Sequence, residues 1–166
     1  SFYKIMKRIH LGAGEDLKGD YINVDLYKKE GVDIVHDLNK YPYPFKDSEI
    51  DEILCNYIIE HLDDPFKVLL ELHRISKPGA IIRIKVPHFS SGDAWNDLQH
   101  RKGFGTLAFR HDNIKDKFKL LRQKITFPKR RAWMKWFANK YPGFYDYNLA
   151  YIFPASDLHV LLRVKK

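Results

Sequence analysis

The chain has 166 residues, a formal net charge of +8 and a single cysteine, Cys55. This length predicts one domain over residues 1–166, and a hydrophobic content of 45% is enough to fill its core. One cysteine excludes an internal disulfide and a cysteine-rich zinc site. The sequence shows neither a signal-peptide pattern nor an apolar run of membrane-spanning length, so we expect a cytoplasmic protein without a transmembrane segment.

The positive charge is concentrated in the segment 101–140. This segment has 13 Lys and Arg against 2 Asp, which gives it a net charge of +11 and leaves the rest of the chain at −3. Such a segment is typical of a surface that meets phosphate, nucleic acid or anionic lipid, although a solvated basic face has the same composition.

Short apolar segments alternate with turns over the first half of the chain, as expected of strands that are buried in a parallel sheet. An amphipathic helix is predicted from the Asp63-Asp64-Pro65 start signal to about Ser76, where Lys77-Pro78-Gly79 stops it. Strands that alternate with helical patterns predict an α/β fold. The strands are predicted over residues 8–11, 21–26, 32–36, 50–55 and 80–86.

The first connection between strands is unusually short. Only ten residues separate Gly14 from the position of Asp25, whereas a crossover between parallel strands normally needs a dozen residues or more. We therefore expect the first crossover helix to be a single turn or absent.

The segment 88–157 is predicted to contain a substrate-side loop and a basic insert. The loop, residues 88–105, is too long for a simple connection, and such loops are usually functional or mobile. In the insert, basic residues interleave with Trp133 and Trp136, a mixture that suits phosphate contact and base stacking, a membrane surface, or a helix that docks its tryptophans on the sheet. The predicted elements after the loop are a short helix over 106–116, a strand over 118–127, a basic amphipathic helix over 129–140 and a closing strand over 158–164.

The most informative stretch is Leu11-Gly12-Ala13-Gly14, read together with Asp25 at the end of the next strand. Gly12 and Gly14 permit a sharp turn and let a ligand approach the backbone closely. An acid in the position of Asp25 can accept hydrogen bonds from both hydroxyls of a ribose. The pair indicates a cofactor that contains a nucleoside, although a tight turn followed by a capping Asp would use the same residues.

The order of these motifs resembles the class I S-adenosylmethionine-dependent methyltransferases, and within them a compact subgroup similar to the methyltransferase type 11 family. The resemblance covers about residues 8–87. Its most specific part is Leu72-His73-Arg74-Ile75-Ser76-Lys77-Pro78-Gly79-Ala80, and His36-Asp37-Leu38 and Glu60-His61-Leu62 agree with it. Two residues depart from the family pattern, since His10 stands where most members have an acid and Asp16 where a third glycine is usual.

The resemblance implies a Rossmann-like, seven-stranded, mostly parallel sheet of order 3-2-1-4-5-7-6, in which strand 7 is antiparallel and corresponds to residues 158–164. It also implies methyl transfer from S-adenosylmethionine to an O or N acceptor of unknown identity. Two other functions stay open. An NAD-type oxidoreductase is disfavoured because the third glycine is absent, and a protein that binds or modifies nucleic acid would use the segment 101–140.

The resemblance also implies roles for individual residues. The glycine loop would lie under the methionine part of the cofactor, Asp25 would hold the ribose and Asp37 the adenine amino group. Leu26 and Leu38 would sandwich the adenine ring. The full predicted cofactor set is Leu11, Gly12, Ala13, Gly14, Asp25, Leu26, Asp37, Leu38, Asn56, Tyr57 and His61.

A general base would be needed only for an alcohol or a protonated amine, and His88, Asp97 and His100 are the candidates. Asp97 and His100 are three residues apart and could pair on a helical turn, although ordinary loop hydrogen bonding is equally consistent with the sequence. His61 is more simply explained by capping or packing. We expect no metal site, because no third ligand is obvious. The expected partner is a methyl acceptor of unknown identity, for which an anionic or phosphate-bearing molecule is a candidate. Nucleic acid is a second candidate partner, and the exposed aromatic residues could serve a homodimer.

Overall fold

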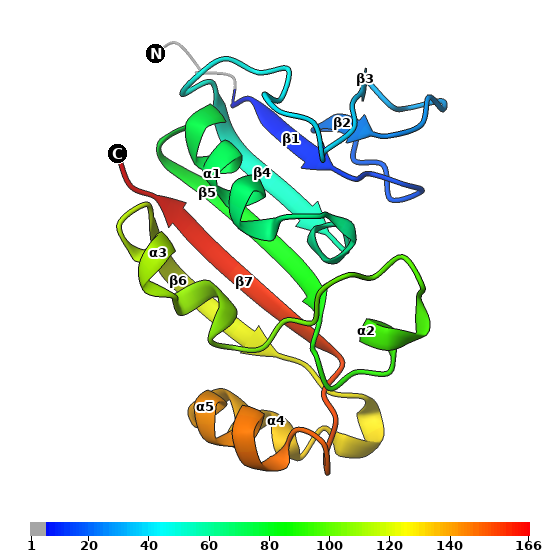
Figure 1. The fold of residues 1–166 in the computed structure, drawn as a ribbon, viewed down its shortest axis with the longest axis vertical. Helices are drawn as coiled ribbons and strands as arrows, with labels where there is room; N and C mark the ends of the chain where they lie inside the picture. Colours follow the sequence, from blue (N-terminus) through cyan, green and yellow to red (C-terminus); the bar gives the residue numbers. More distant parts are fainter. Residues whose placement is uncertain (1–5) are drawn as a thin grey trace.

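The computed structural model describes residues 6–166, so the first five residues of the predicted domain lie outside it (Figure 1). Seven strands form one sheet in the order β3-β2-β1-β4-β5-β7-β6. The strands β1 to β5 pair in parallel, and β7 is antiparallel to both of its neighbours. The predicted fold class and strand order are therefore confirmed. The strands are β1 (Arg8–Leu11), β2 (Ile22–Asp25), β3 (Ile34–Val35), β4 (Ile50–Asn56), β5 (Ser76–Pro87), β6 (Phe118–Ile125) and β7 (Asp157–Val164).

The connections at the start of the sheet contain turns in place of helices. Over residues 12–21, between β1 and β2, the structure has no helix, which confirms the expectation from the short spacing. The connections over residues 26–33 and 36–49 also lack one. The first helical turn of the described chain is η1 (Ile59–His61), directly after β4.

The main helix, α1 (Pro65–Ile75), follows η1 and packs on one face of the sheet (Figure 1). The side chain of Asp64 accepts hydrogen bonds from the backbone N–H groups of Phe66 and Lys67, which satisfies two of the free donors at the helix start. Leu72 and Ile75 are fully buried against the core. The next strand, β5, begins at Ser76, four residues before its predicted start. Lys77-Pro78-Gly79 therefore lies within the strand, where the pairing with β4 has a register shift.

The sheet is covered asymmetrically at its β5 and β7 strands. Along both strands buried residues alternate with half-buried or exposed ones, as in a sheet with one covered face. Ile82 and Leu162 are fully buried, whereas Arg83 and Arg163 are exposed. The burial expected for the first three strands is found in the last three residues of β1 and β2, but not in β3, where Ile34 is half-buried and Val35 is exposed at the edge of the sheet.

The two helices predicted after the loop are each broken. The region 106–116 forms η2 (Ala108–Arg110) and α3 (Asp112–Lys115), with extended backbone at His111 between them. The region 129–140 forms η3 (Lys129–Arg131) and α4 (Met134–Lys140), and α5 (Pro142–Phe144) with the π-helical turn η4 (Tyr145–Leu149) follows. A further short helix, α2 (Asp93–Asn96), lies inside the long loop.

The tryptophans of the basic insert are not docked on the sheet. Trp133 and Trp136 are 65% and 68% exposed, while Met134 and Ala138 are the buried residues of α4. The spacing of residues in the sequence does not show whether the side with Trp133 and Trp136 or the side with Met134 and Ala138 is buried. Among the described residues, no helix combines the length and the hydrophobicity needed to cross a bilayer.

Candidate functional site

A cavity of about 680 Å³ lies where the carboxyl ends of the first parallel strands meet, and we call it the glycine-loop pocket. Ligands of open α/β sheets bind at this edge, and the volume is in the range of small-molecule sites. Its walls come from the glycine loop, the ends of β2 and β3, η1 and the loop after α2. The lining residues are Gly12, Gly14, Asp25, Leu26, Tyr27, Lys29, His36, Asp37, Leu38, Asn39, Tyr57, Ile58, His61, Leu62, Leu98, Gln99 and Arg101.

The glycines of the loop are required by its backbone. Gly12 and Gly14 have φ values of +65° and +54°, which L side chains rarely adopt. A Cβ atom on Gly12 would also overlap the side chain of Ile58. The chain therefore turns sharply after β1 and presents bare backbone to the pocket.

Asp25 joins the glycine loop to the end of β2. Its Oδ2 accepts a hydrogen bond from the backbone N–H of Gly14 at 2.7 Å, and its Oδ1 accepts one from the N–H of Tyr27 at 3.0 Å. Each carboxylate oxygen can accept two hydrogen bonds, so one acceptor position on each oxygen is left for a ligand with two neighbouring hydroxyls. Asp25 thus lines the glycine-loop pocket with one acceptor position left on each carboxylate oxygen.

The residues that the resemblance assigns to adenine line the same cavity. Leu26 and Leu38 both line the glycine-loop pocket, and so does Asp37, whose Oδ1 accepts from the backbone N–H of Asn39 at 3.0 Å. Leu11 and Ala13 are buried and are not among the lining residues, so they support the loop from the core side.

Two further residues of the predicted cofactor set lie at the end of β4. Asn56 does not line this pocket, and its Nδ2 donates to Oδ2 of Asp16 at 3.3 Å. Tyr57 does line it, with a left-handed φ of +51°. The Tyr57 hydroxyl donates to Oδ1 of Asp157 at 2.9 Å, and the Lys85 ammonium lies 4.5 Å from its ring centre. A strained backbone held by such contacts is typical of residues that position a ligand.

A second, more open cavity of about 730 Å³ adjoins the first, and we call it the histidine groove. Tyr57, His61, Leu98 and Gln99 line both cavities, so the two share these side chains as a common wall. The residues lining the groove are Tyr57, Glu60, His61, Pro87, Asp93, Asn96, Asp97, Leu98, Gln99 and His100.

The groove brings three of the sequence candidates together. The rings of His61 and His100 have centroids 4.5 Å apart, and Nε2 of His100 lies 3.8 Å from Oδ2 of Asp97. Nδ1 of His100 lies 3.3 Å from the carbonyl oxygen of Ala94. A carbonyl only accepts, so Nδ1 carries the proton in this contact and Nε2 keeps its lone pair in the neutral ring. Burial, and to a smaller extent the charge of His100, lowers the pKa of His61.

Glu60 also lines this groove. In the sequence it belongs to the motif Glu60-His61-Leu62, and the motif alone implies no separate role for it. It is 1% exposed, and among the described residues neither carboxylate oxygen has a hydrogen-bond partner. Burial raises the pKa of Glu60 to about 7. The sequence feature that could have identified Glu60 as a site residue is its position directly before His61, shortly after the end of a strand. The reason given for expecting no metal, that no third ligand is near, does not hold once Glu60 is placed beside the two histidines.

His88, the remaining candidate base, lies outside both cavities and is fully buried. Its Nε2 donates to Oδ1 of Asp146 at 3.1 Å, and its Nδ1 lies 2.8 Å from Oγ of Ser90. Oδ2 of Asp146 also accepts from both N and Oγ1 of Thr106 at 2.7 Å. Both ring nitrogens of His88 are therefore engaged in holding the long loop to η4.

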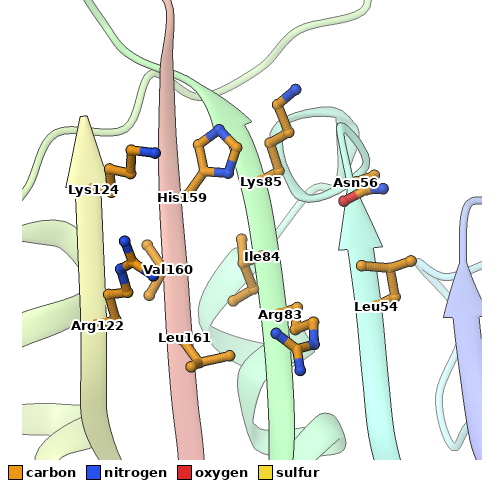
Figure 2. A pocket seen from close by; sticks show the side chains of 10 residues that line it. All are labelled: Leu54, Asn56, Arg83, Ile84, Lys85, Arg122, Lys124, His159, Val160 and Leu161. Atoms are coloured by element: carbon orange, nitrogen blue, oxygen red, sulfur yellow. The ribbon is translucent and has the colours of Figure 1, made fainter. Parts of the chain in front are cut away.

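A third cavity, of about 370 Å³, lies on the open face of the sheet, and we call it the basic hollow. Figure 2 shows its side chains on β4, β5, β7 and β6. Arg83 and Lys85 of β5 face Arg122 and Lys124 of β6 across His159. Burial and the charge of Lys85 lower the pKa of His159. Two members of the basic segment, Arg122 and Lys124, thus join two basic residues that lie outside it in the sequence.

Comparison with known proteins gives one family match and many similar folds. Residues 14–84 match a family model described as a methyltransferase domain, and no curated protein sequence matches the chain. A SAM-dependent methyltransferase from Archaeoglobus fulgidus has a TM-score of 0.67 at 17% identity, over 98% of this chain and 88% of that one. A putative methyltransferase from Bacillus halodurans has a TM-score of 0.65 at 13% identity, over 98% and 94%.

The [4+2]-cyclase SpnF has a similar fold, with a TM-score of 0.64 at 12% identity over 96% of this chain and 75% of that one. Identities this low show the fold alone, and a fold can host more than one reaction. The structural matches and the family match over residues 14–84 agree with each other and with the motif order. They confirm the predicted resemblance: this chain has the class I methyltransferase fold, and its residues 14–84 match the methyltransferase domain family.

Proposed function

We propose that this chain is an S-adenosylmethionine-dependent methyltransferase that acts on an O or N acceptor. The observation that carries the proposal is the Asp25 carboxylate, which the Gly14 and Tyr27 N–H groups hold at the edge of the glycine-loop pocket. The family match and the cavity volume support the same cofactor.

In this proposal, different side chains of the pocket bind different parts of the cofactor. Asp25 accepts hydrogen bonds from the ribose hydroxyls, and Asp37 accepts one from the adenine amino group. Leu26 and Leu38 enclose the adenine ring. When bound, S-adenosylmethionine supplies a methyl group on a sulfonium ion, and the protein contributes mainly by aligning this group with the acceptor.

The histidine groove holds the acceptor in this proposal. It reaches the glycine-loop pocket along Tyr57 and His61, which is the path that a methyl group must cross. Nε2 of His100 and the Asp97 carboxylate are the candidate proton acceptors there, because both line the groove. His88 positions the loop that carries them and does not contact the acceptor. The segment 88–157 therefore supplies the acceptor side, within one domain that we place in the cytoplasm.

The proposal is tested by calorimetric titration of the chain with S-adenosylmethionine and its demethylated product. We expect Asp25→Ala to weaken the binding of both ligands at least about a hundredfold, since two hydrogen bonds to a charged group are lost. Asp20→Ala is the matched control, because this exposed acid pairs with Arg8 and does not line the pocket. Full affinity in Asp25→Ala, or no affinity in the wild type, would contradict the proposal.

The basic hollow favours a second candidate, a nucleic acid as the acceptor or as a bound partner. Four basic side chains on one sheet face, together with the exposed Trp133 and Trp136, are the elements of phosphate contact and base stacking. We expect single-stranded RNA or DNA to bind with a steep salt dependence that Arg122→Glu reduces. Lys28→Glu, an exposed charge reversal away from the hollow, should not reduce it. Absence of binding at low salt would remove this candidate.

A further inference from the structure

We propose that Glu60, His61 and His100 form a binding site for a divalent transition-metal ion, of which Zn²⁺ is the reference case, in the histidine groove. One ligand atom from each of these side chains lies within 4.8 Å of the others. Two imidazoles and one carboxylate are a donor set that suits zinc and the other late divalent metals.

The unpartnered carboxylate of Glu60 is the first argument. Its two oxygens are buried and accept no hydrogen bond from any described residue, an arrangement that a folded protein rarely tolerates. The carboxylate lines the groove beside His100. A cation held between Glu60 and the histidines supplies the missing partner.

The tautomer of His100 is the second argument. Its Nδ1–H donates to the carbonyl of Ala94, so the lone pair of Nε2 can coordinate an ion. Metal-binding histidines are generally fixed in this way, with the second nitrogen bonded to a carbonyl or carboxylate. With the ion bound, Nε2 no longer accepts a proton, and Asp97 is the proton acceptor that remains in the groove.

The geometry needs a small adjustment when the ion binds. Ligand atoms around a tetrahedral ion with bonds of about 2.1 Å are about 3.4 Å apart, so ligand atoms whose separation approaches the 4.8 Å limit must move inward. His100 lies on the loop that follows α2 and can make this movement more readily than the strand-anchored η1. Three protein ligands also leave an open position, as in catalytic zinc sites.

The open position faces the groove that we assign to the acceptor, so this part of the inference rests on the proposed function. An acceptor oxygen bound there would have a lowered pKa and would lie beside His61, which lines both cavities. The inference therefore adds a metal-ligating oxygen to the description of the acceptor.

The test is calorimetric titration of the chelator-treated full chain with ZnCl₂, followed by thermal unfolding with and without the ion. We expect one Zn²⁺ per chain and a rise in Tm. Glu60→Gln and His100→Ala should each weaken binding at least about tenfold, because even the loss of an outer-shell partner costs ten- to a hundredfold. His111→Ala is the control for an exposed histidine outside the groove, and it should bind as the wild type does.

Folding of each variant is checked by circular dichroism, and bound Co²⁺ gives a second readout through its visible absorption, which His100→Ala should change. No binding to the wild type, or equal binding to the wild type and both variants, would overturn the inference. Titration of the same preparation with S-adenosylhomocysteine separates the two proposals. Nucleoside binding without Zn²⁺ binding rejects only the metal site, whereas the reverse result rejects the proposed function.

Discussion

The glycine-loop pocket and the histidine groove share Tyr57 and His61, but the chain builds them in different ways. The pocket lies on the ends of β1, β2 and β3, whose positions are set by strand pairing. Much of the groove lies on η1 and on the loop with α2, which side-chain hydrogen bonds hold in place. A site on paired strand ends is positioned by the backbone, whereas a site on loops depends on the few contacts that fix them.

The largest expected effect is at the backbone-built site. Gly12→Ala places a Cβ on Ile58 at a positive φ, and we expect it to lower the free energy of unfolding by about 2–4 kcal/mol. Gly19→Ala is the matched control, because beyond its two chain neighbours no atom of residues 6–166 lies within 4 Å of its Cβ position. It should change stability by about 0.5 kcal/mol or less. Urea unfolding measures both, and equal stability of the two variants would show that the loop is not constrained as described.

The anchor of the loop-built site should contribute less. Asp146→Asn loses one charge-assisted contact to His88 or Thr106, and we expect the free energy of unfolding at pH 7 to fall by about 1–3 kcal/mol. Asp116→Asn is the control at an exposed carboxylate, and it should have little effect on stability. Urea unfolding with S-adenosylhomocysteine titration should show lower stability but retained cofactor affinity, because the pocket does not include this anchor.

The same anchor gives a pH dependence with a defined sign. Burial alone would raise the pKa of Asp146, but hydrogen bonds from His88 and Thr106 outweigh it and lower the pKa. A lowered folded pKa adds stability above the unfolded value of about 3.9, and this stability is lost as the pH falls through the folded pKa. The difference between the wild type and Asp146→Asn should therefore shrink in acid. A difference that grows below pH 4 would contradict this assignment.

The smallest effect is expected at the shared wall. Tyr57→Phe removes the hydrogen bond to Asp157 and should cost about 1 kcal/mol or less, because the site is partly exposed. A double-mutant cycle with Asp157→Asn isolates this contact from the other bonds of Asp157. Additive effects of the two changes would show that Tyr57 is held by its strand end alone, as the pocket is.

The candidate sites differ in how far the sequence could predict them. The glycine loop and Asp25 were recognised because strand, turn and strand follow one another within 18 residues, Arg8 to Asp25. Asp97 and His100 are candidate bases because they lie three residues apart in the long loop, and the structure brings them to the groove with His61. His88, like His61, is a histidine that follows the end of a strand, but its ring is buried and both of its nitrogens have hydrogen-bond partners. Residue type cannot distinguish a buried histidine from an available one.

The sequence by itself determined the missing first crossover helix and the strand-end pocket, because both depend on short-range spacing and on strand periodicity. The sheet order was implied by the resemblance of the motifs to a known family, and the strand pairing confirms it. Only the tertiary structure decided that Glu60 meets His100 forty residues later, and that Arg83 and Lys85 face Arg122 and Lys124. It also decided that Trp133 and Trp136 face solvent. These outcomes depend on which side of a strand or a short helix is covered, and that is set by distant segments packing together and not by local pattern.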